Sequence, residues 1–128
     1  VLALFGAPVT QESPNLSAIS AALEIQKKFD SLRNQWKLRS ELFAQIGLGI
    51  GISRGPMYLG DVGSGRRLDY TVVGADVNIA QRLASETAAG QILITESVYN
   101  DVADQCSIQE EKTRLLRGME NKIQLYSI

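Results

Sequence analysis

Glycine occupies every second position in one short stretch of the sequence, the run IGLGIGIS at residues 46–53. Bulky apolar residues fill the alternate positions, so a β-strand is expected over Gln45 to Ser53, with one bulky face and one nearly bare face. A bare strand face inside a folded protein is closed by another element that approaches the backbone. The stretch therefore predicts a strand on which a second element packs unusually closely.

These glycines do not form a common phosphate-binding loop. The dinucleotide-binding pattern G-x-G-x-x-G opens a helix after a strand, whereas the three glycines here lie inside the strand itself. A second glycine-rich run, GDVGSG at residues 60–65, lacks the Lys-Ser/Thr pair that ends a P-loop. It is better explained as the tip of a β-hairpin that joins residues 57–59 to residues 68–73.

Two segments show helical periodicity. A long amphipathic helix is expected to begin at Ser13-Pro14, with a capping hydroxyl followed by proline in the first turn. A second helix is expected from Gly74 to about Thr87. The apolar positions of the first helix that are predicted to face the core are Leu16, Ile19, Ala22, Ile25, Phe29, Leu32 and Trp36, and those of the second are Val77, Ala80 and Ala84.

The remaining elements alternate between strand and helix. They are predicted as a buried strand over Val1–Phe5, a strand over Gln91–Thr95, a helix over Glu96–Ala103, a weak strand over Ser107–Glu110 and a final strand over Ile123–Ile128. This order predicts an α+β sandwich of the ferredoxin-like type, with helices on one face of a largely antiparallel sheet.

The amino-acid composition argues against several classes of protein. Thirteen Lys and Arg against 14 Asp and Glu leave a net charge of -1, so no basic excess draws the chain to nucleic acid or to an anionic membrane. Cys106 is the only cysteine, which fits a reducing, cytoplasmic compartment. No apolar run approaches the roughly 20 residues that span a bilayer. Because the chain opens on an apolar run without an initiator Met, we expect it to be part of a larger protein.

Two polar side chains stand out on the second helix. Asn78 and Arg82 are four residues apart, which places them on one helix face about a turn from each other, where they can contact one ligand. On spacing alone, the simpler interpretation is a solvated face with Arg82 loosely paired to Glu86.

The run DYTVVGADVNIAQRL, residues 69–83, closely resembles the signature of class III adenylate and guanylate cyclase catalytic domains. Further blocks resemble that family in the same order: FGAP at residues 5–8, IGLGIGISRG, GDVGS, AAGQILIT and the closing RGMENKIQLY. The resemblance implies that residues 1–128 are a partial cyclase catalytic domain of the class III α+β type, truncated at the N-terminus. It also implies conversion of a nucleoside triphosphate to its 3',5'-cyclic monophosphate and pyrophosphate.

The resemblance implies a role for each candidate site residue. Asn78 corresponds to the asparagine that orients the ribose, and Arg82 to the arginine that stabilises the triphosphate in the transition state. Thr71, with its neighbour Val72, occupies the purine-reading position. A threonine at this position resembles the adenylate cyclases, which implies ATP as the substrate. Some members place a triphosphate-binding lysine near the position of Gln124, whereas the nearest lysine here is Lys122.

Other parts of the implied machinery lie outside this sequence. Members of the family hold two Mg²⁺ or Mn²⁺ ions on two aspartates, and both positions, like a purine-reading lysine, fall before Val1. No metal ligand is therefore expected in this chain, and the isolated fragment is expected to be inactive. The resemblance also implies a homodimer in which one copy supplies the metals and purine pocket and the other supplies the asparagine and arginine.

Three alternatives remain open. The complete domain could be a guanylate cyclase, or a degenerate cyclase domain with a regulatory or binding role. A ferredoxin-like RNA-binding module is the third, but its strands would carry exposed aromatic residues among basic ones, and no strand predicted here has that pattern.

Overall fold

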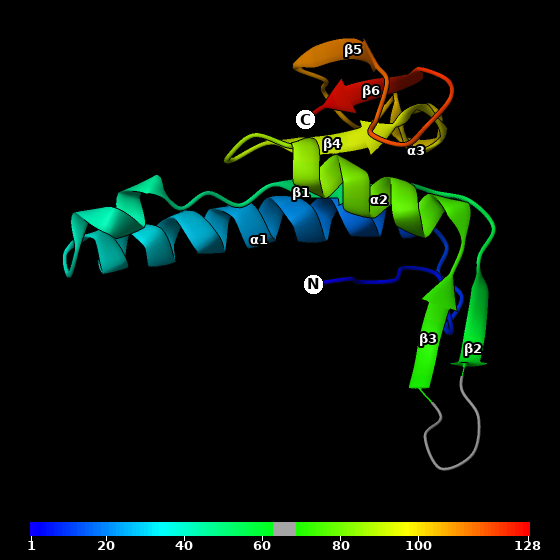
Figure 1. The fold of residues 1–128 in the computed structure, drawn as a ribbon, viewed down its shortest axis with the longest axis horizontal. Coiled ribbons are helices and arrows are strands. Elements are labelled where there is room, and N and C mark those ends of the chain that lie inside the picture. The colour runs from blue at the N-terminus through cyan, green and yellow to red at the C-terminus, as the bar shows by residue number, and fades with distance from the viewer. Residues whose placement is uncertain (63–68) are drawn as a thin grey trace.

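The computed structural model describes residues 1–62 and 69–128. Their elements are shown in Figure 1. In chain order they are the helix α1 (Pro14–Lys37), the 3-10 helix η1 (Glu41–Gln45), β1 (Ile50–Ile52), β2 (Tyr58–Val62), β3 (Asp69–Val73), α2 (Ala75–Glu86), β4 (Ile92–Thr95), α3 (Glu96–Val102), β5 (Glu110–Arg114) and β6 (Ile123–Ser127).

Four of the strands form one sheet in the order β1-β4-β6-β5. β1 pairs with β4 in parallel, whereas the β4–β6 and β5–β6 pairs are antiparallel, so the largely antiparallel sheet is confirmed. β2 and β3 form a separate antiparallel hairpin that points away from this sheet (Figure 1). The hairpin is confirmed as well, although part of its predicted tip, residues 63–65, lies outside the described residues.

Helices cover both faces of the sheet. Ile92 and Ile94 of β4 pack in one apolar cluster with residues of α1 and α3. Leu93, which points the opposite way, packs in a second cluster with Leu83 of α2. The predicted placement of all helices on one face was therefore wrong. The physical reason is visible in β4, where all four residues are buried, as expected for a strand covered on both sides.

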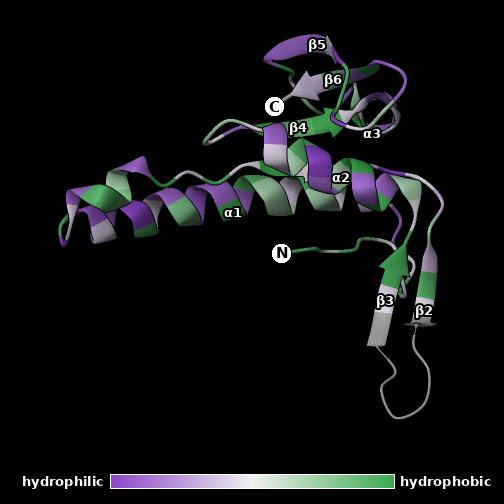
Figure 2. Cartoon of the chain, in the orientation of Figure 1, coloured by the Kyte–Doolittle hydropathy of each residue, from purple (hydrophilic) through white to green (hydrophobic). Residues whose placement is uncertain are grey.

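The polarity of the strands follows this burial. β4 lies in the middle of the sheet and is strongly hydrophobic, whereas the edge strand β5 is hydrophilic (Figure 2). β5 begins at Glu110, not at Ser107 as predicted. Its sequence EEKTR pairs with β6 alone and carries no apolar alternation, so hydrophobic periodicity could not locate it.

The bare glycine face of β1 is confirmed as a site of close packing. A Cβ atom built on Gly51 would lie 2.6 Å from the carbonyl oxygen of Ala80 and 2.6 Å from the backbone nitrogen of Ala84, both in α2. On Gly49 it would lie 2.9 Å from Cβ of Thr87, just past the end of α2. The helix that carries the candidate site residues therefore rests directly on the backbone of β1. The regular strand is shorter than predicted, because Gln45 ends η1 and pairing with β4 begins at Ile50.

The long helix begins at Pro14 as predicted, but the Ser13 side chain makes no capping hydrogen bond. Its apolar stripe is buried near the start, at Ile19 and Ala22, whereas Ile25 and Leu32, further along the helix, are 51% and 44% exposed. With 24 residues α1 is about 36 Å long. Its C-terminal half runs beyond the sheet (Figure 1), and so no strand lies beneath that part of the stripe.

The predicted buried strand over Val1–Phe5 is not formed. Val1 and Leu2 are exposed, and no strand of the described residues pairs with this segment. An isolated extended segment leaves its backbone donors and acceptors without a ladder, so an apolar sequence alone does not make a strand. No helix among the described residues is long and apolar enough to cross a membrane.

Candidate active site

Asn78 and Arg82 lie on α2, as the sequence predicted. α2 follows β3 after the single residue Gly74, whose carbonyl oxygen accepts a hydrogen bond from the backbone N–H of Asn78 at 3.4 Å. The Asn78 side chain is exposed and Arg82 is half-buried. The neighbouring Leu83 is fully buried and packs in the apolar cluster that holds α2 against the sheet. The helix therefore presents an amide and a guanidinium one turn apart on its solvent-facing side.

The core face of α2 differs from the prediction. Leu83 is the buried residue and Ile79 packs beside it, whereas Ala84 is exposed and Val77 is half-buried. Ala80 and Ala84 lie against β1 through their backbone atoms, because Gly51 has no side chain to keep the helix away from the strand. An interpretation based on side-chain periodicity could not detect such a backbone contact.

The guanidinium of Arg82 lies beside the turn that precedes β6. A Cβ atom built on Gly118 would lie 3.4 Å from Nη2 of Arg82, and Gly118 adopts a φ of +75°, a conformation that favours glycine. The expected pairing with Glu86 is not among the ion pairs of the described residues. Glu86 instead accepts a hydrogen bond from the backbone N–H of Arg117 at 3.3 Å. The simpler interpretation, a solvated face on which Arg82 pairs with Glu86, is therefore not supported.

Thr71 and Val72 lie in β3, opposite Gly60 and Leu59 of β2. Both are half-buried. Directly opposite residues in an antiparallel pair share one face, so the glycine leaves the cross-strand position next to Thr71 without a side chain. A Cβ atom built on Gly60 would lie 2.8 Å from the hydroxyl oxygen of Tyr58, so the tyrosine ring covers the position opposite Thr71.

A shallow cavity of about 290 Å³ opens at the N-terminal end of α2. Asp76 and Ile79 line it from the helix, and Lys122 and Gln124 line it from the segment that enters β6. The amide of Gln124 is occupied, since its Nε2 donates to a carboxylate oxygen of Glu111 at 2.7 Å. Of the two candidate triphosphate contacts, Lys122 is thus the one whose charged group is not engaged in an ion pair of the described residues.

The loop that supports the start of α2 was not predicted from the sequence. The Ser53 hydroxyl donates to the carbonyl oxygen of Asp76, and the carboxylate of Asp76 lies where a side chain on Gly55 would be. In the sequence, Ser53 is predicted to end the glycine-rich strand. The only sequence signal for a turn at this place is the pair Ser53 and Gly55, two residue types that are common in turns.

Comparison with known proteins agrees with this arrangement. The profile of the "Adenylate and Guanylate cyclase catalytic domain" family matches residues 2–128. An adenylate cyclase of Anabaena cylindrica is 31% identical over 118 residues, which are 87% of this chain and 24% of that protein. An adenylate cyclase of Mycobacterium bovis is 38% identical over 65 residues, or 51% of this chain and 14% of that protein. The chain thus spans a quarter or less of the length of these relatives.

Solved structures of both cyclase types have the same fold. The guanylyl cyclase Cya2 superposes with a TM-score of 0.83 at 31% identity, covering 96% of this chain and 61% of that one. The adenylyl cyclase CyaB from P. aeruginosa superposes with a TM-score of 0.81 at 30% identity, covering 96% and 63%. The family match over nearly the whole length, the fold and the α2 motif together place this chain in the class III adenylate and guanylate cyclase catalytic domain family.

Proposed function

We propose that the complete catalytic domain converts ATP to 3',5'-cyclic AMP and pyrophosphate, and that it does so as a cytoplasmic homodimer. One observation carries the proposal: α2 presents Asn78 and Arg82 on one solvent-facing side, one turn apart, directly after the strand that bears Thr71. The fold and the family support a nucleotidyl cyclase, and these three side chains are the basis for the finer assignment.

Asn78 is proposed to orient the ribose. Cyclisation requires the 3'-oxygen to attack the α-phosphorus in line with the departing pyrophosphate, so the sugar must be held in one orientation. An asparagine amide both donates and accepts hydrogen bonds, which matches the hydroxyl and ring oxygen of a ribose. Its exposure on the first turns of α2 leaves this amide accessible to a ligand.

Arg82 is proposed to stabilise the charge that develops on the phosphoryl oxygens and the leaving pyrophosphate. A guanidinium is permanently charged and presents its donors in a fixed plane, which suits oxygen atoms of a phosphoryl group. Partial burial and the nearby turn at Gly118 restrict the orientation of this side chain before the substrate binds. Preorganised donors of this kind contribute on the order of 10²- to 10³-fold to turnover.

Thr71, with Val72, is proposed to read adenine. Thr71 lies in the strand directly before α2, and the ring of Tyr58 lies over Gly60, the residue opposite it. Because a threonine hydroxyl can donate or accept, the hydrogen-bonding chemistry alone also permits guanine. Guanylate cyclase activity is therefore the second candidate, and the similarity to the guanylyl cyclase Cya2 favours keeping it.

The divalent metal that the resemblance implies does not fit the residues described here. Within residues 1–62 and 69–128 no group of three or more His, Cys, Asp or Glu side chains could hold a metal ion. The resemblance places the ligands ahead of Val1, and the chain covers 61–63% of the two solved cyclases. We therefore expect the 128-residue chain to be inactive by itself. Mg²⁺ or Mn²⁺ bound to the complete domain would supply Lewis-acid chemistry at the phosphates.

The β2–β3 hairpin is proposed to contribute to the homodimer. It projects away from the four-stranded sheet (Figure 1), and so its residues are available to a second copy. A two-fold arrangement would repeat the same contacts on both sides and would form two equivalent clefts. In such a cleft one copy would offer Thr71 and the other Asn78 and Arg82.

Substrate assays on the complete domain test this proposal. Purified domain is incubated with ATP or GTP and Mg²⁺ or Mn²⁺, and the cyclic nucleotide is quantified. ATP is expected to be preferred, and Thr71→Ala is expected to lower kcat/KM for ATP about tenfold, the effect of losing one hydrogen bond of about 1.4 kcal/mol. A clear preference for GTP contradicts the adenine assignment. The absence of product with either nucleotide supports the degenerate, regulatory alternative.

A further inference from the structure

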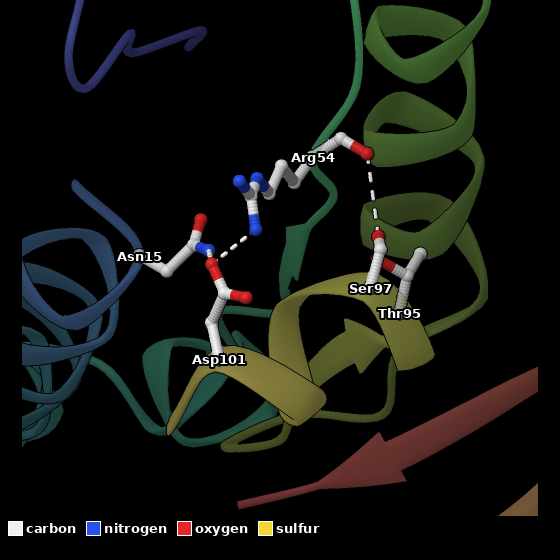
Figure 3. A network of polar contacts seen from close by, with 5 residues as sticks. All are labelled: Asn15, Arg54, Thr95, Ser97 and Asp101. Atoms are coloured by element: carbon white, nitrogen blue, oxygen red, sulfur yellow. Dashed lines mark hydrogen bonds and ion pairs between the residues drawn. The ribbon is translucent and has the colours of Figure 1, made fainter. Parts of the chain in front are cut away.

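One carboxylate joins three parts of the fold that are distant in sequence. Oδ2 of Asp101, in α3, accepts a hydrogen bond from Nδ2 of Asn15 at 2.7 Å and also pairs with Nη1 of Arg54 (Figure 3). The carbonyl oxygen of Arg54 accepts from the Ser97 hydroxyl at 3.3 Å, and that hydroxyl lies 2.9 Å from Oγ1 of Thr95. Both the side chain and the backbone of Arg54 are therefore held by α3 and the end of β4.

Arg54 belongs to the β1–β2 loop, residues 53–57, which also contacts the first turn of α2. The Ser53 hydroxyl donates to the carbonyl oxygen of Asp76, and the Asp76 carboxylate lies over Gly55. A Cβ atom on Gly74 would lie 3.0 Å from the carbonyl oxygen of Pro56. The β1–β2 loop thus lies between the Arg54 contacts on one side and the start of α2 on the other.

The ion pair between Arg54 and Asp101 contributes little to the overall stability of the domain. The side chains of Arg54 and Asp101 are 52% and 44% exposed. Exposed ion pairs typically change the unfolding equilibrium less than about fivefold. The contacts provide geometry, because Arg54 pairs with Asp101 and accepts from Ser97, both in α3, while Asn15 links Asp101 to α1.

We propose that Arg54 is a positioning residue for the cyclase reaction, acting through the β1–β2 loop on the first turn of α2. This inference rests on the proposed function, since Asn78 lies two residues after Asp76 and Arg82 lies one turn further. Displacements of about 1 Å at a reacting group can lower turnover about 100-fold. Loss of an exposed tether should displace α2 less than that, so we expect kcat to fall about tenfold.

The test compares variants of the complete catalytic domain. Arg54→Ala and Asp101→Ala are each expected to lower kcat about tenfold, with KM for ATP within about twofold of wild type, because alignment is lost more than binding. The double variant should be no worse than either single one. Reversing the pair with Arg54→Asp and Asp101→Arg together should restore at least half of the loss on a logarithmic scale.

Arg33→Ala is the matched control. Arg33 pairs with Asp30 at 2.9 Å and approaches the carbonyl oxygen of Ile46 at 3.5 Å, so it also links two segments, but it lies in the second half of α1, away from the β1–β2 loop. Its kcat is expected to remain within twofold of wild type. Equal losses in Arg33→Ala and Arg54→Ala would overturn the positioning role.

Amide hydrogen exchange separates this inference from the proposed function. In Arg54→Ala, exchange at residues 53–57 and 74–78 should accelerate at least tenfold while the unfolding equilibrium changes less than fivefold. Unchanged exchange and unchanged kcat would overturn the inference. A wild-type domain without cyclase activity would overturn the proposed function and the catalytic effect of Arg54 with it, whereas exchange would still report whether Arg54 fixes the loop.

Discussion

Replacement of Gly51 by alanine should strongly destabilise the domain. The added Cβ atom would lie 2.6 Å from Ala80 O and 2.6 Å from Ala84 N, which are backbone atoms of α2. Overpacking of a core costs about 1–3 kcal/mol. Because a hydrogen-bonded helix backbone moves less easily than a side chain, we expect about 3 kcal/mol, a change on the order of 10²-fold in the unfolding equilibrium.

Gly90→Ala is the matched control for this prediction. Gly90 has a φ of +81°, so alanine is strained there, but no atom lies within 4 Å of the added Cβ. The expected cost is the backbone term alone, about 1–2 kcal/mol. Urea unfolding of the complete domain measures both variants. A Gly51→Ala variant that is no less stable than Gly90→Ala would refute the idea that α2 rests on the bare face of β1.

Three further predictions concern stability. Ile19→Ala should cost about 2–5 kcal/mol in urea unfolding, whereas Leu32→Ala, on the exposed half of the same helix, should cost less than about 1 kcal/mol; similar losses would contradict the two-part burial of α1. Gln26→Ala should cost about 0.5–1.5 kcal/mol, the net value of one hydrogen bond, because its Nε2 donates to the carbonyl oxygen of Leu48 at 2.8 Å while that oxygen keeps its bond from the backbone N–H of Gly90; a neutral change would contradict this contact. Burial raises the pKa of Tyr126, so the folded state holds that proton more tightly and stability should fall as the pH rises above about 10; Tyr126→Phe should reduce this fall in pH-dependent unfolding, and an unchanged profile would contradict it.

Much of the region around the candidate site could be predicted from the sequence. The spacing of four between Asn78 and Arg82 places both on one side of a helix, and the alternating glycines predict that a second element packs closely on β1, although not that this element is α2. Both signals are local, because they depend on the 3.6-residue and two-residue periods of single elements. The roles of the site residues came from the resemblance and stay predictions.

Other features depend on how elements meet, and the sequence could not indicate them. All four residues of β4 are buried because helices lie on both sides, yet a four-residue apolar run fits several arrangements. The second half of α1 has the same periodicity as the first but no sheet beneath it. The pair between Arg54 and Asp101 joins residues 47 positions apart, and no sequence period links them.

The central claim, that this chain carries the transition-state side of a nucleotidyl cyclase, is tested most directly at Arg82. Cyclic AMP formation is measured for the complete wild-type domain, for Arg82→Ala and for Gln81→Ala, an exposed neighbour on the same helix. We predict a loss of 10²- to 10³-fold in kcat for Arg82→Ala, with Gln81→Ala within about twofold of wild type. An Arg82→Ala variant as active as wild type would contradict the account.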